Sequence, residues 1–398
     1  MRAITLVLGL SQIIGYGSIY YAFPILVPGV ARSFEVSEPL VYGIFSVGLL
    51  LGGFAAPAAG RAMDRHGAPL VMTLGSLAAV AGLVAVSLAP NLWVYAAGII
   101  ALEAISVMLL YDAAFAALVR FAGGEARRDI VRLTLIAGFA STIFWPLTGW
   151  LADLLGWRGT YQVFGGLNLL AAGLHLWLVR QRPLAEQGPI PGRRRRAEVA
   201  VPLPAEDQAR AFGAVALSFA LTAALISAFG VQMVPIFEAA GLGAGATLVA
   251  MLMGPSQVAI RLIDSLFWHN LHPLSVAVIS ALALPTAVIG LLLGLPVWLA
   301  APAFAVLFGA GGGLSSIVRG SVPLALFGAD GYGGRLGRLA LVRTVVSSAA
   351  PFVFAALMAW IGLKLSLALF FALGVGAALP LVMLRLRLAR QGRLAPLR

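Results

Sequence analysis

The chain has 398 residues, of which 61 % are hydrophobic and 11 % are charged, and this composition leaves too little polar surface for a soluble globule of that size. The 27 Lys and Arg outnumber the 15 Asp and Glu, but they gather on one side of the predicted membrane spans, which excludes nucleic acid as an expected partner. The absence of cysteine excludes disulfides, iron–sulfur clusters and thiolate metal sites.

Apolar runs long enough to cross a bilayer follow one another along the chain. A transmembrane helix needs about 20 predominantly apolar residues. Such runs are expected at residues 4–30, 39–60, 70–89, 92–119, 131–152, 160–179, 211–237, 246–267, 274–294, 297–318, 339–360 and 364–385. The first run shows no small-residue cleavage site, so we expect no cleavable signal peptide. The pattern predicts an all-α membrane protein with twelve transmembrane helices.

One long polar segment separates the first six spans from the last six. It is rich in proline and contains four consecutive arginines, Arg193–Arg196. We predict an N-terminal six-helix half at residues 1–180, a cytoplasmic linker at 181–210, a C-terminal six-helix half at 211–388 and a cytoplasmic tail at 389–398. The arginine cluster is explained either by membrane topology alone or by contact with anionic headgroups.

Three short patterns recur in the same order in the two halves. The pairs are Phe23-Pro24-Ile25 with Val234-Pro235-Ile236, Ala68-Pro69-Leu70 with His272-Pro273-Leu274, and Ser141-Thr142 and Pro146 with Ser347-Ser348 and Pro351. The shared order predicts an internal duplication, with two pseudo-symmetric halves around a site near the membrane midplane.

The basic residues also predict the orientation of the chain in the membrane. Most of them lie at the N-terminus, in the even-numbered loops or in the tail, whereas Arg32, Arg158 and Lys364 lie in the opposite set of loops. By the positive-inside rule, we expect both termini to be cytoplasmic. The preference for Arg over Lys, with abundant Ala and Gly, suggests a GC-rich bacterial gene and therefore a bacterial inner (plasma) membrane.

We expect a polar loop of eight residues, GRAMDRHG at 60–67, between the second and third spans. Its two glycines supply backbone freedom for a tight turn. Asp64 is placed to accept hydrogen bonds from backbone N–H groups at a helix end. The arrangement G-x-x-x-D-R-x-G resembles the loop between spans two and three of the major facilitator superfamily, a group of secondary transporters.

This resemblance implies the fold of that superfamily, with alternating access to a central site between two halves. The basic residues that usually follow the last glycine are Ala68 and Pro69 here, and the second-half counterpart at residues 268–272 lacks the acid and the arginines. A generic positive loop retained for topology is the alternative. The gating role that the resemblance implies falls on Gly60, Asp64, Arg65 and Gly67.

Two acids in the fourth span are functional candidates, because an ionisable group in hydrocarbon costs at least about 2.5 kcal/mol. Glu103 lies near the midplane, and we interpret it either as a proton-coupling residue or as a glutamate hydrogen-bonded between helices. Asp112 follows nine residues later, which in a continuous helix places the two acids on opposite faces. The resemblance implies that Asp112 is a latch partner of Arg65, with substrate contact or a solvated boundary charge as alternatives. Arg319 falls at the same depth in the tenth span, and we assign it to gating with Asp112.

The eighth span carries Gln257, Arg261 and Asp264 at spacings that align them on one helical face. An arginine inside a span needs a partner or water, so we interpret Arg261 either as an anion-binding residue or as half of a structural or gating pair with Asp264. Asp264 is also a proton-coupling candidate. The monocarboxylate-transporter branch of the superfamily is similar in having an acid and an arginine on this span, although there the acid comes first.

Aromatic and amide side chains provide the other predicted substrate contacts. Spans one, four, seven and ten line the cavity in the superfamily, so the resemblance points to polar side chains in those spans. Packing between helices is the alternative interpretation for the aromatic residues. The predicted contacts are Tyr16, Tyr20 and Tyr21, which follow Gln12 in span one, Trp145 in span five and Gln232 in span seven.

The chain lacks the patterns of several enzyme and transporter classes. There is no Walker loop, since the one lysine is Lys364, and no catalytic-triad spacing or metal-ligand cluster. The four histidines are too scattered to form one site. The G-P-x-x-G-G pattern of many drug/proton antiporters is also missing from span five. We expect no enzymatic activity, no metal and no cofactor, with an ion or proton gradient as the energy source and the lipid bilayer and a small-molecule substrate as partners of a monomer.

The predicted function is secondary active transport of a small organic anion such as a monocarboxylate. Efflux of drugs or of metalloids such as arsenite is the alternative, and a membrane scaffold or sensor without transport is the third hypothesis. Gly156-Trp157-Arg158 and Arg319-Gly320 with Pro323 resemble bacterial porters near the monocarboxylate and arsenite-efflux branches. An arsenite route here would have to work without cysteine ligands.

Overall fold

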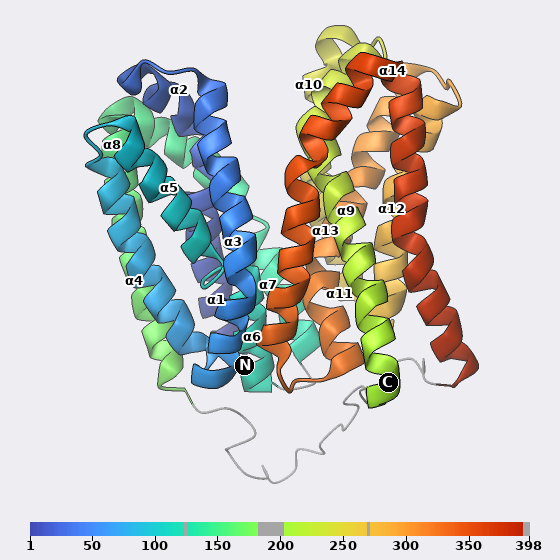
Figure 1. The fold of residues 1–398 in the computed structure, drawn as a ribbon, viewed down its shortest axis with the longest axis horizontal. Coiled ribbons are helices and arrows are strands. Elements are labelled where there is room, and N and C mark those ends of the chain that lie inside the picture. Colours follow the sequence, from blue (N-terminus) through green and yellow to red (C-terminus); the bar gives the residue numbers. More distant parts are fainter. Residues whose placement is uncertain (123–125, 182–202, 269–270, 393–398) are drawn as a thin grey trace. The chain divides into compact units, whose positions relative to one another are not determined.

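The computed structural model describes residues 1–122, 126–181, 203–268 and 271–392. These residues are helical almost throughout, and Figure 1 shows long helices running beside one another. The elements up to residue 181 are α1 (Arg2–Gly15), the π-helix η1 (Tyr16–Tyr21), α2 (Phe23–Phe34), α3 (Glu38–His66), α4 (Ala68–Ser87), α5 (Leu92–Ser106), α6 (Tyr111–Ala122), α7 (Arg127–Ala137) and α8 (Ala140–Val179). Those that follow are α9 (Ala205–Ala239), the 3-10 helix η4 (Gly243–Gly245), α10 (Ala246–Ala250), α11 (Met253–Phe267), α12 (Pro273–Leu292), α13 (Val297–Phe327) and α14 (Tyr332–Arg390).

The chain divides into two compact units. The first contains Met1–Ala197 together with Ala329–Leu341, and the second contains Glu198–Gly328 and Val342–Arg398. The first turns of α14 therefore belong to the first unit, and the remainder of α14 belongs to the second.

Ten helical stretches of the described residues are long and apolar enough to cross a membrane. Two of them contain a glycine whose backbone is not helical: Gly156 in α8, with φ 66° and ψ 177°, and Gly362 in α14, with φ 79° and ψ 167°. Glycine alone adopts such angles without strain. The 59 residues of α14 would extend about 88 Å as one straight helix, far beyond a hydrocarbon core of about 30 Å. Figure 1 shows that α14 reverses direction instead.

Four predicted spans are interrupted where the apolar pattern indicated continuous helices, among them residues 131–152, which leave the helix at 138–139 between α7 and α8. Residues 4–30 contain the π-helix η1, in which the N–H of Ala22 donates to the carbonyl of Gly17; Pro24, which has no N–H, follows it. Residues 92–119 leave the helix at 107–110, and residues 246–267 leave it at 251–252. The premise that placed Glu103 and Asp112 on opposite faces of one continuous helix is therefore wrong, because residues 107–110 between them are not helical.

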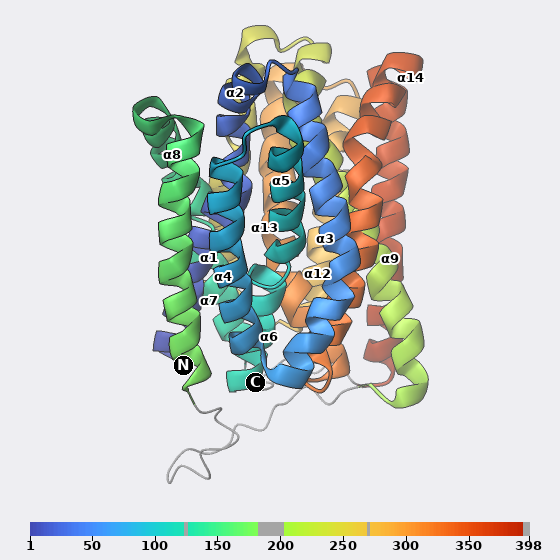
Figure 2. The same cartoon turned by 60° about the vertical axis from the view of Figure 1, so that its left-hand side comes forward.

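Each unit has its own apolar core. In the first unit, α4 packs along α8, as Figures 1 and 2 show, and the core includes Tyr95, Trp157 and Phe164. In the second unit, α12 packs along α13, and Phe229 is the centre of a cluster of aromatic rings. The rings of Phe304, Phe308, Phe354 and Phe370 all lie within 5.8 Å of Phe229, centroid to centroid.

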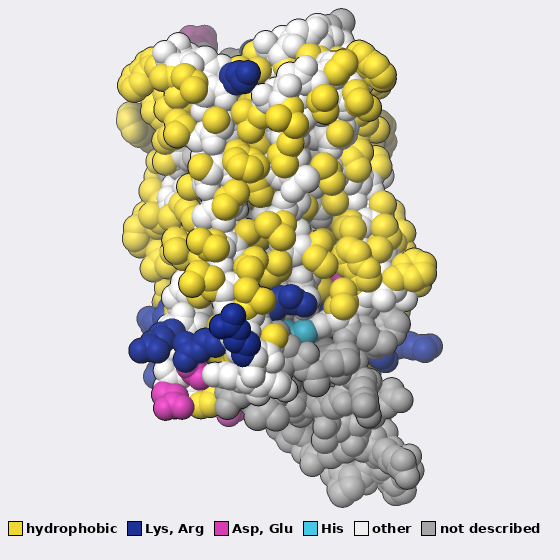
Figure 3. Space-filling model, turned by 90° about the vertical axis from the view of Figure 1, so that its right-hand side faces the viewer, with side chains coloured by type: hydrophobic (Ala, Val, Ile, Leu, Met, Phe, Trp, Pro, Cys, Tyr) yellow, Lys and Arg dark blue, Asp and Glu magenta, His cyan; other side chains and the backbone are white. Residues whose placement is uncertain are grey.

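The surface distribution of side chains is that expected of a membrane protein. On the face shown in Figure 3, hydrophobic side chains cover a broad band, and Lys and Arg side chains gather beside one edge of it. Many exposed side chains in the helices are large and apolar, among them Trp93, Trp298 and Trp360. Such a surface is suited to contact with lipid rather than with water.

Candidate functional site

A cluster of aromatic side chains surrounds the π-helix in the first unit. The Tyr16 ring lies 4.7 Å from that of Tyr111 in α6, and the Tyr21 ring lies 6.2 Å from that of Trp145 in α8. Tyr20 lies 5.9 Å from the ring of Phe45 in α3. Four predicted substrate contacts, Tyr16, Tyr20, Tyr21 and Trp145, are therefore brought together from two helical segments.

This aromatic cluster is open to the surface of the chain. Trp145 is 55 % exposed and Tyr20 is 43 % exposed, whereas Tyr111 is buried. Sequence reasoning missed Tyr111 and Phe45, although Tyr111 directly precedes Asp112, one of the predicted gating residues. Rings with one accessible side provide flat apolar area and, through the tyrosine hydroxyls, hydrogen-bonding groups for a ligand.

Buried polar side chains hold the π-helix in place. The Asn168 amide donates to the hydroxyl of Ser18 at 2.8 Å, and Ser18 donates to the carbonyl of Ile14. A Cβ atom at Gly17 would lie 2.2 Å from the Phe144 ring, so this position requires glycine. Gln12 is fully buried, and its amide donates at 2.8 Å to the carbonyl of Leu109 in the break between α5 and α6. Gln12 therefore supports the backbone and does not join the exposed tyrosines.

Glu103 in α5 lies beside this cluster and is only 3 % exposed. Two glycines of α3 allow the close approach: a Cβ at Gly48 would lie 2.9 Å from the Glu103 Cβ, and a Cβ at Gly52 would lie 2.8 Å from its carbonyl oxygen. Helix α5 also contacts the π-helix η1, which carries the tyrosines. Within the described part of the chain, the Glu103 carboxyl makes no ion pair and no hydrogen bond to a side chain. Proton coupling at Glu103 stays a prediction.

The predicted gating segment is mostly helical rather than a loop. The helix α3 continues through Asp64 and Arg65 to His66, and α4 begins at Ala68. Gly67 alone makes the turn, with φ 87° and ψ 134°. The expectation of an eight-residue polar loop is therefore wrong, because one glycine with a positive φ is sufficient to separate the two helices. Arg65 is exposed at the end of α3.

Asp64 caps the first turn of α14. Its carboxylate accepts the backbone N–H of Gly333 at 2.8 Å and that of Gly334 at 2.7 Å. A carboxylate is stabilised at a helix N-terminus because the N–H groups there lack intrahelical partners and the helix dipole is positive. The expected hydrogen bonds from a helix end are thus present, and the structure identifies α14 as the helix that donates them.

Small residues bring α3 and the start of α14 into backbone contact. A Cβ at Gly60 would lie 2.1 Å from the carbonyl oxygen of Gly333, and a Cβ at Gly337 would lie 2.3 Å from that of Ala56. Such spacing of small residues is typical of closely packed membrane helices. Gly333 and Gly337 were not among the predicted gating residues, although their four-residue spacing was a signal that could have identified them.

Asp112 and Arg319 occupy different units. Asp112 lies in the first turn of α6 and is partly buried, and Arg319 lies in α13 and is partly buried. The latch between Asp112 and Arg65 and the placing of Arg319 opposite Asp112 both stay predictions.

The polar face of α11 is turned inward within the second unit. Arg261 is 7 % exposed and Asp264 is 1 % exposed. The Arg261 Nε donates to the carbonyl of Gly313 in α13 at 3.3 Å. Gln257 is half-buried on the same face, and a Cβ at Gly313 would lie 2.8 Å from the Gln257 carbonyl oxygen. The three predicted residues therefore line the contact between α11 and α13.

Gln232, the remaining predicted contact, lies in α9. Its amide is 3.5 Å from the carbonyl of Pro351 in α14, at the limit of a hydrogen bond. Gln232 therefore approaches the backbone of α14, and its role as a substrate contact stays a prediction.

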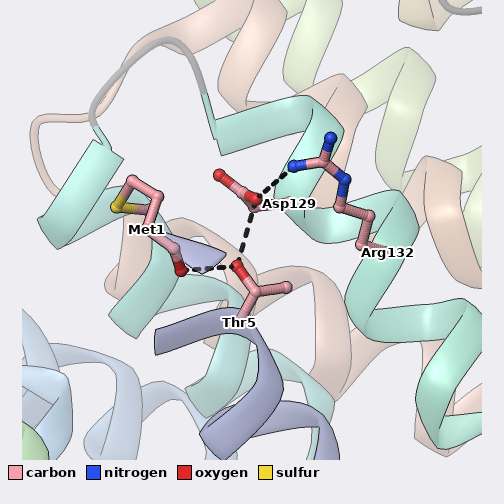
Figure 4. Close-up of polar contacts among 4 residues, drawn as sticks. All are labelled: Met1, Thr5, Asp129 and Arg132. Carbon is pink, nitrogen blue, oxygen red and sulfur yellow. Dashed lines mark hydrogen bonds and ion pairs between the residues drawn. The ribbon is translucent and has the colours of Figure 1, made fainter. Parts of the chain in front are cut away.

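Sequence reasoning missed a polar link between α1 and α7, drawn in Figure 4. The Thr5 hydroxyl lies 3.0 Å from the Asp129 Oδ1 and 3.1 Å from the carbonyl of Met1. Arg132 forms an ion pair with the same Asp129 oxygen at 3.3 Å. Asp129 is buried, so these contacts compensate for its loss of water. The link fixes the beginning of α1 on the first turn of α7.

Another missed feature is the structural role of Trp157 and Arg158, which follow the break in α8. The Trp157 indole donates to the hydroxyl of Ser33 at 2.8 Å. The Arg158 guanidinium donates to the carbonyls of Ser87 and Ala89, at 2.9 and 2.8 Å, and lies 4.2 Å from the Trp157 ring. Arg158 thus satisfies the carbonyls at the end of α4.

The comparisons with known proteins identify the family. Residues 8–284 match the family described as Major Facilitator Superfamily. The chain belongs to the Major Facilitator Superfamily. No curated protein sequence matches it.

Solved structures of this superfamily share the fold of the chain. The human organic anion transporter MFSD10 (TETRAN) is similar over 96 % of this chain and 99 % of its own, with a TM-score of 0.76 and 16 % identity. The proton:xylose symporter XylE, bound to 6-bromo-6-deoxy-D-glucose, is similar over 95 % of this chain and 94 % of its own, with a TM-score of 0.62 and 14 % identity. Since these two proteins carry different classes of solute, the shared fold does not identify a substrate.

Membership of the Major Facilitator Superfamily gives one interpretation to the buried ionic side chains of both units. Members of this superfamily are transporters, and buried ionic side chains in transporter helices mark substrate or ion pathways. In the first unit, the aromatic cluster and Glu103 form one candidate site. In the second unit, Arg261, Asp264 and Gln257 form the other. In the described ranges, no group of three or more His, Asp or Glu side chains is placed to hold a metal ion.

Proposed function

We propose that this chain is a secondary active transporter that works by alternating access and carries a small organic anion, such as a monocarboxylate. The observation that supports this most is the burial of ionic side chains inside apolar helices, Glu103 in α5 and Arg261 with Asp264 in α11. Each such group costs at least about 2.5 kcal/mol in hydrocarbon, so a functional reason for keeping it is expected.

The proposed topology has twelve membrane crossings. It counts α8 as divided at Gly156, so that α7 and the first part of α8 form one crossing, and α14 as divided at Gly362. Both termini are cytoplasmic, following the arginine distribution, and the membrane is the bacterial inner (plasma) membrane. Within the superfamily, the proposed placement is near the branches of monocarboxylate porters and arsenite exporters.

Arg261 is the proposed anion-binding residue, with Gln257 beside it. A guanidinium carries five N–H donors and binds a carboxylate through two of them, so the bond to the Gly313 carbonyl is compatible with binding of an anion. Asp264 competes with the anion for Arg261. A structural pair of Arg261 and Asp264 is the alternative, and it predicts a loss of folding rather than of transport when Arg261 is replaced.

The energy source is a proton or ion gradient, without a cofactor and without enzymatic activity. Glu103 and Asp264 are the proposed proton carriers, because each is an acid buried inside an apolar helix. Gly60, Asp64, Arg65 and Gly67, together with Asp112 and Arg319, are the proposed gating residues. The working unit is a monomer whose partners are the lipid bilayer and the small-molecule substrate.

The test of the anion assignment is transport by purified protein in liposomes. Candidate monocarboxylates are first identified by thermal shift and then by counterflow. Arg261→Gln is expected to abolish counterflow while the protein stays folded, and Arg210→Gln, an exposed arginine in α9, is the matched control. A folded Arg261→Gln protein with normal counterflow would remove Arg261 from the site. ATP hydrolysis by the pure chain would contradict secondary transport.

Proton coupling is tested separately at Glu103. Glu103→Gln mimics the protonated acid, so it is expected to leave solute exchange intact while eliminating accumulation driven by a pH gradient. Accumulation that persists in this variant would exclude Glu103 as the coupling residue. The measurement is substrate uptake into liposomes with and without an imposed proton gradient.

Efflux of drugs or metalloids is the second candidate function, and the exposed aromatic cluster favours the drug-like substrate. Planar apolar compounds bind to aromatic rings that keep one face accessible, as Trp145 and Tyr20 do. Overexpression should then raise cellular tolerance to a panel of toxins, and Trp145→Ala should remove the effect for aromatic compounds only. An unchanged tolerance profile would leave the anion as the better assignment.

A further inference from the structure

The end of α14 carries three exposed arginines within six residues: Arg385, Arg387 and Arg390. This part of α14 packs between two other helices of the second unit. A Cβ at Gly374 would lie 2.9 Å from Pro285 of α12, and one at Gly376 would lie 3.9 Å from Leu221 of α9. The arginines therefore stand where three helices end together.

Two of these arginines are held in place by neighbouring helices. The Arg385 Nε donates at 3.0 Å to the hydroxyl of Ser275, in the first turn of α12. An Arg387 Nη is 2.9 Å from the Oδ1 of Asp207, in the first turn of α9. A long side chain that is already ordered loses less entropy when it binds a ligand. The first turn of α9 carries two acids, Asp207 and the exposed Glu206, against three guanidinium groups, so an excess of positive charge remains. The N-terminus of α12 adds to the positive potential.

An apolar stripe leads along α14 to this cluster. Leu379, Met383 and Leu386 are exposed, and with Arg390 they have the spacings i, i+4, i+7 and i+11, which place all four on one face of the helix. The face shown in Figure 3 has the same arrangement on a larger scale, with a band of hydrophobic side chains bordered by basic ones. One helix face thus presents apolar side chains followed by guanidinium groups.

We propose that this end of α14 is a binding site for an anionic phospholipid. The headgroup phosphate lies among Arg385, Arg387 and Arg390, and an acyl chain runs along Leu379, Met383 and Leu386. Guanidinium groups suit the phosphate because their planar N–H donors bind two of its oxygens at once. The apolar stripe favours a lipid over a free phosphate, because a free phosphate has no acyl chain to contact the exposed leucines.

The corresponding end of α8 in the first unit provides an internal comparison. Arg180 directly follows α8 and is exposed. Within the described residues, its side chain has no hydrogen bond to a neighbouring helix of the kind that holds Arg385 and Arg387. Arg180 is therefore a basic residue at a helix end without a preorganised site, and it serves as the matched control.

The test measures lipid retention by the full chain in detergent, using native mass spectrometry. The protein is incubated with cardiolipin, phosphatidylglycerol or phosphatidylcholine. All three lipids carry the same type of acyl chain, so that the headgroup is what differs. The wild type is expected to retain the two anionic lipids preferentially. Each arginine replaced by glutamine is expected to weaken their binding about fivefold, so the combined Arg385→Gln, Arg387→Gln, Arg390→Gln variant should lose the preference. Arg180→Gln should retain lipid as the wild type does.

Single variants keep the proposal testable if the triple variant misfolds. In the described residues, Arg390 makes no hydrogen bond to another helix, so Arg390→Gln should leave the packing intact. This variant alone is expected to weaken the binding of anionic lipid about fivefold. Leu386→Gln should weaken lipid retention without changing binding of inorganic phosphate. Equal retention of phosphatidylcholine and cardiolipin, an equal loss in Arg180→Gln, or unchanged retention in Arg390→Gln would each overturn the site. Inorganic phosphate binding as tightly as the lipid would overturn the lipid assignment.

Discussion

The breaks in α8 and α14 have the same backbone but different surroundings. Gly156 and Gly362 are each followed four residues later by a hydroxyl that donates to the glycine carbonyl, Thr160 in the first unit and Ser366 in the second, both at 2.8 Å. A proline precedes each break, Pro146 and Pro351. The backbone pattern of a duplicated segment is thus present in both units.

The side chains that follow the two glycines differ in what they contact. In the first unit, Trp157 is buried beside Phe34, Tyr95 and Tyr161, and Arg158 binds the carbonyls at the end of α4. The corresponding residues of the second unit are Leu363, partly buried against the phenylalanine cluster, and Lys364, which is exposed.

This difference separates what the backbone specifies from what the side chains specify at the two breaks. The turn is specified by backbone geometry, which only glycine satisfies without strain, so it is kept in both halves. The side chains beyond it are specified by neighbours, and these differ: polar and aromatic contacts fix the break in the first unit, and apolar packing covers the break in the second. Substitutions at matched positions test this comparison.

The largest difference is expected between Trp157→Ala and Leu363→Ala. Trp157→Ala leaves a cavity among three aromatic rings and removes the hydrogen bond to Ser33, for an expected loss of about 3–5 kcal/mol in unfolding free energy. Leu363→Ala should cost about 1–2 kcal/mol, because Leu363 is only partly buried. Unfolding by SDS in mixed micelles, followed by circular dichroism, measures both. Equal losses would contradict the asymmetry.

Gly156→Ala and Gly362→Ala are expected to have similar effects. Each forces a residue with a Cβ into a backbone region that is essentially restricted to glycine, at a cost of about 1–3 kcal/mol. No atom lies within 4 Å of a Cβ built at either position, so backbone strain alone sets the cost. The same unfolding measurement applies. If only one of the two variants loses unfolding free energy, the two breaks do not have equivalent backbones.

Arg158→Gln should destabilise the chain, whereas Lys364→Gln should not. Arg158 loses two bonds to carbonyl groups and its contact with the Trp157 ring, for about 1–3 kcal/mol. Lys364 is exposed, so a change within about 0.5 kcal/mol is expected. Arg158→Lys is the control for charge, since a lysine cannot reproduce the planar donor arrangement. Full stability of Arg158→Lys would show that charge alone acts at this site.

The smallest effects are expected at the hydroxyls that donate to the two glycine carbonyls. Thr160→Val and Ser366→Ala each remove one hydrogen bond, for about 0.5–1.5 kcal/mol. If the two turns are equivalent, the losses should agree within the error of the measurement. A larger loss at Thr160 would indicate that the first break depends more on this bond.

Much of the fold could be predicted because apolar length and paired prolines are local signals. The matched Pro24 and Pro235, and Pro146 and Pro351, predict an internal duplication from the sequence alone. The interruptions at 107–110 and 251–252 could not be predicted, because the residues that leave the helix are as apolar as those that stay in it. What supports the first of these breaks is Gln12, almost a hundred residues away in sequence.

The candidate site was predictable only where residue type carries the signal. A buried acid or arginine in a span is unusual in itself, so Glu103 and Arg261 were identified. The residues that complete each group were not, because Tyr111, Phe45 and Gly313 are ordinary in apolar sequence and gain meaning from their neighbours in space. Asp64 was expected at a helix end, but the hydrogen-bonded positions Gly333 and Gly334 lie some 270 residues further on.

The contact between Asp64 and α14 makes two separate demands on the residues opposite the acid. Asp64 accepts peptide N–H groups, so the donors at 333 and 334 are kept by every residue except proline. Space is the second demand, because a Cβ at Gly333 would lie 2.7 Å from the Gly60 carbonyl oxygen and 2.8 Å from the Asp64 Oδ1. A genetic screen that recovers the acid should therefore also recover the glycine at 333.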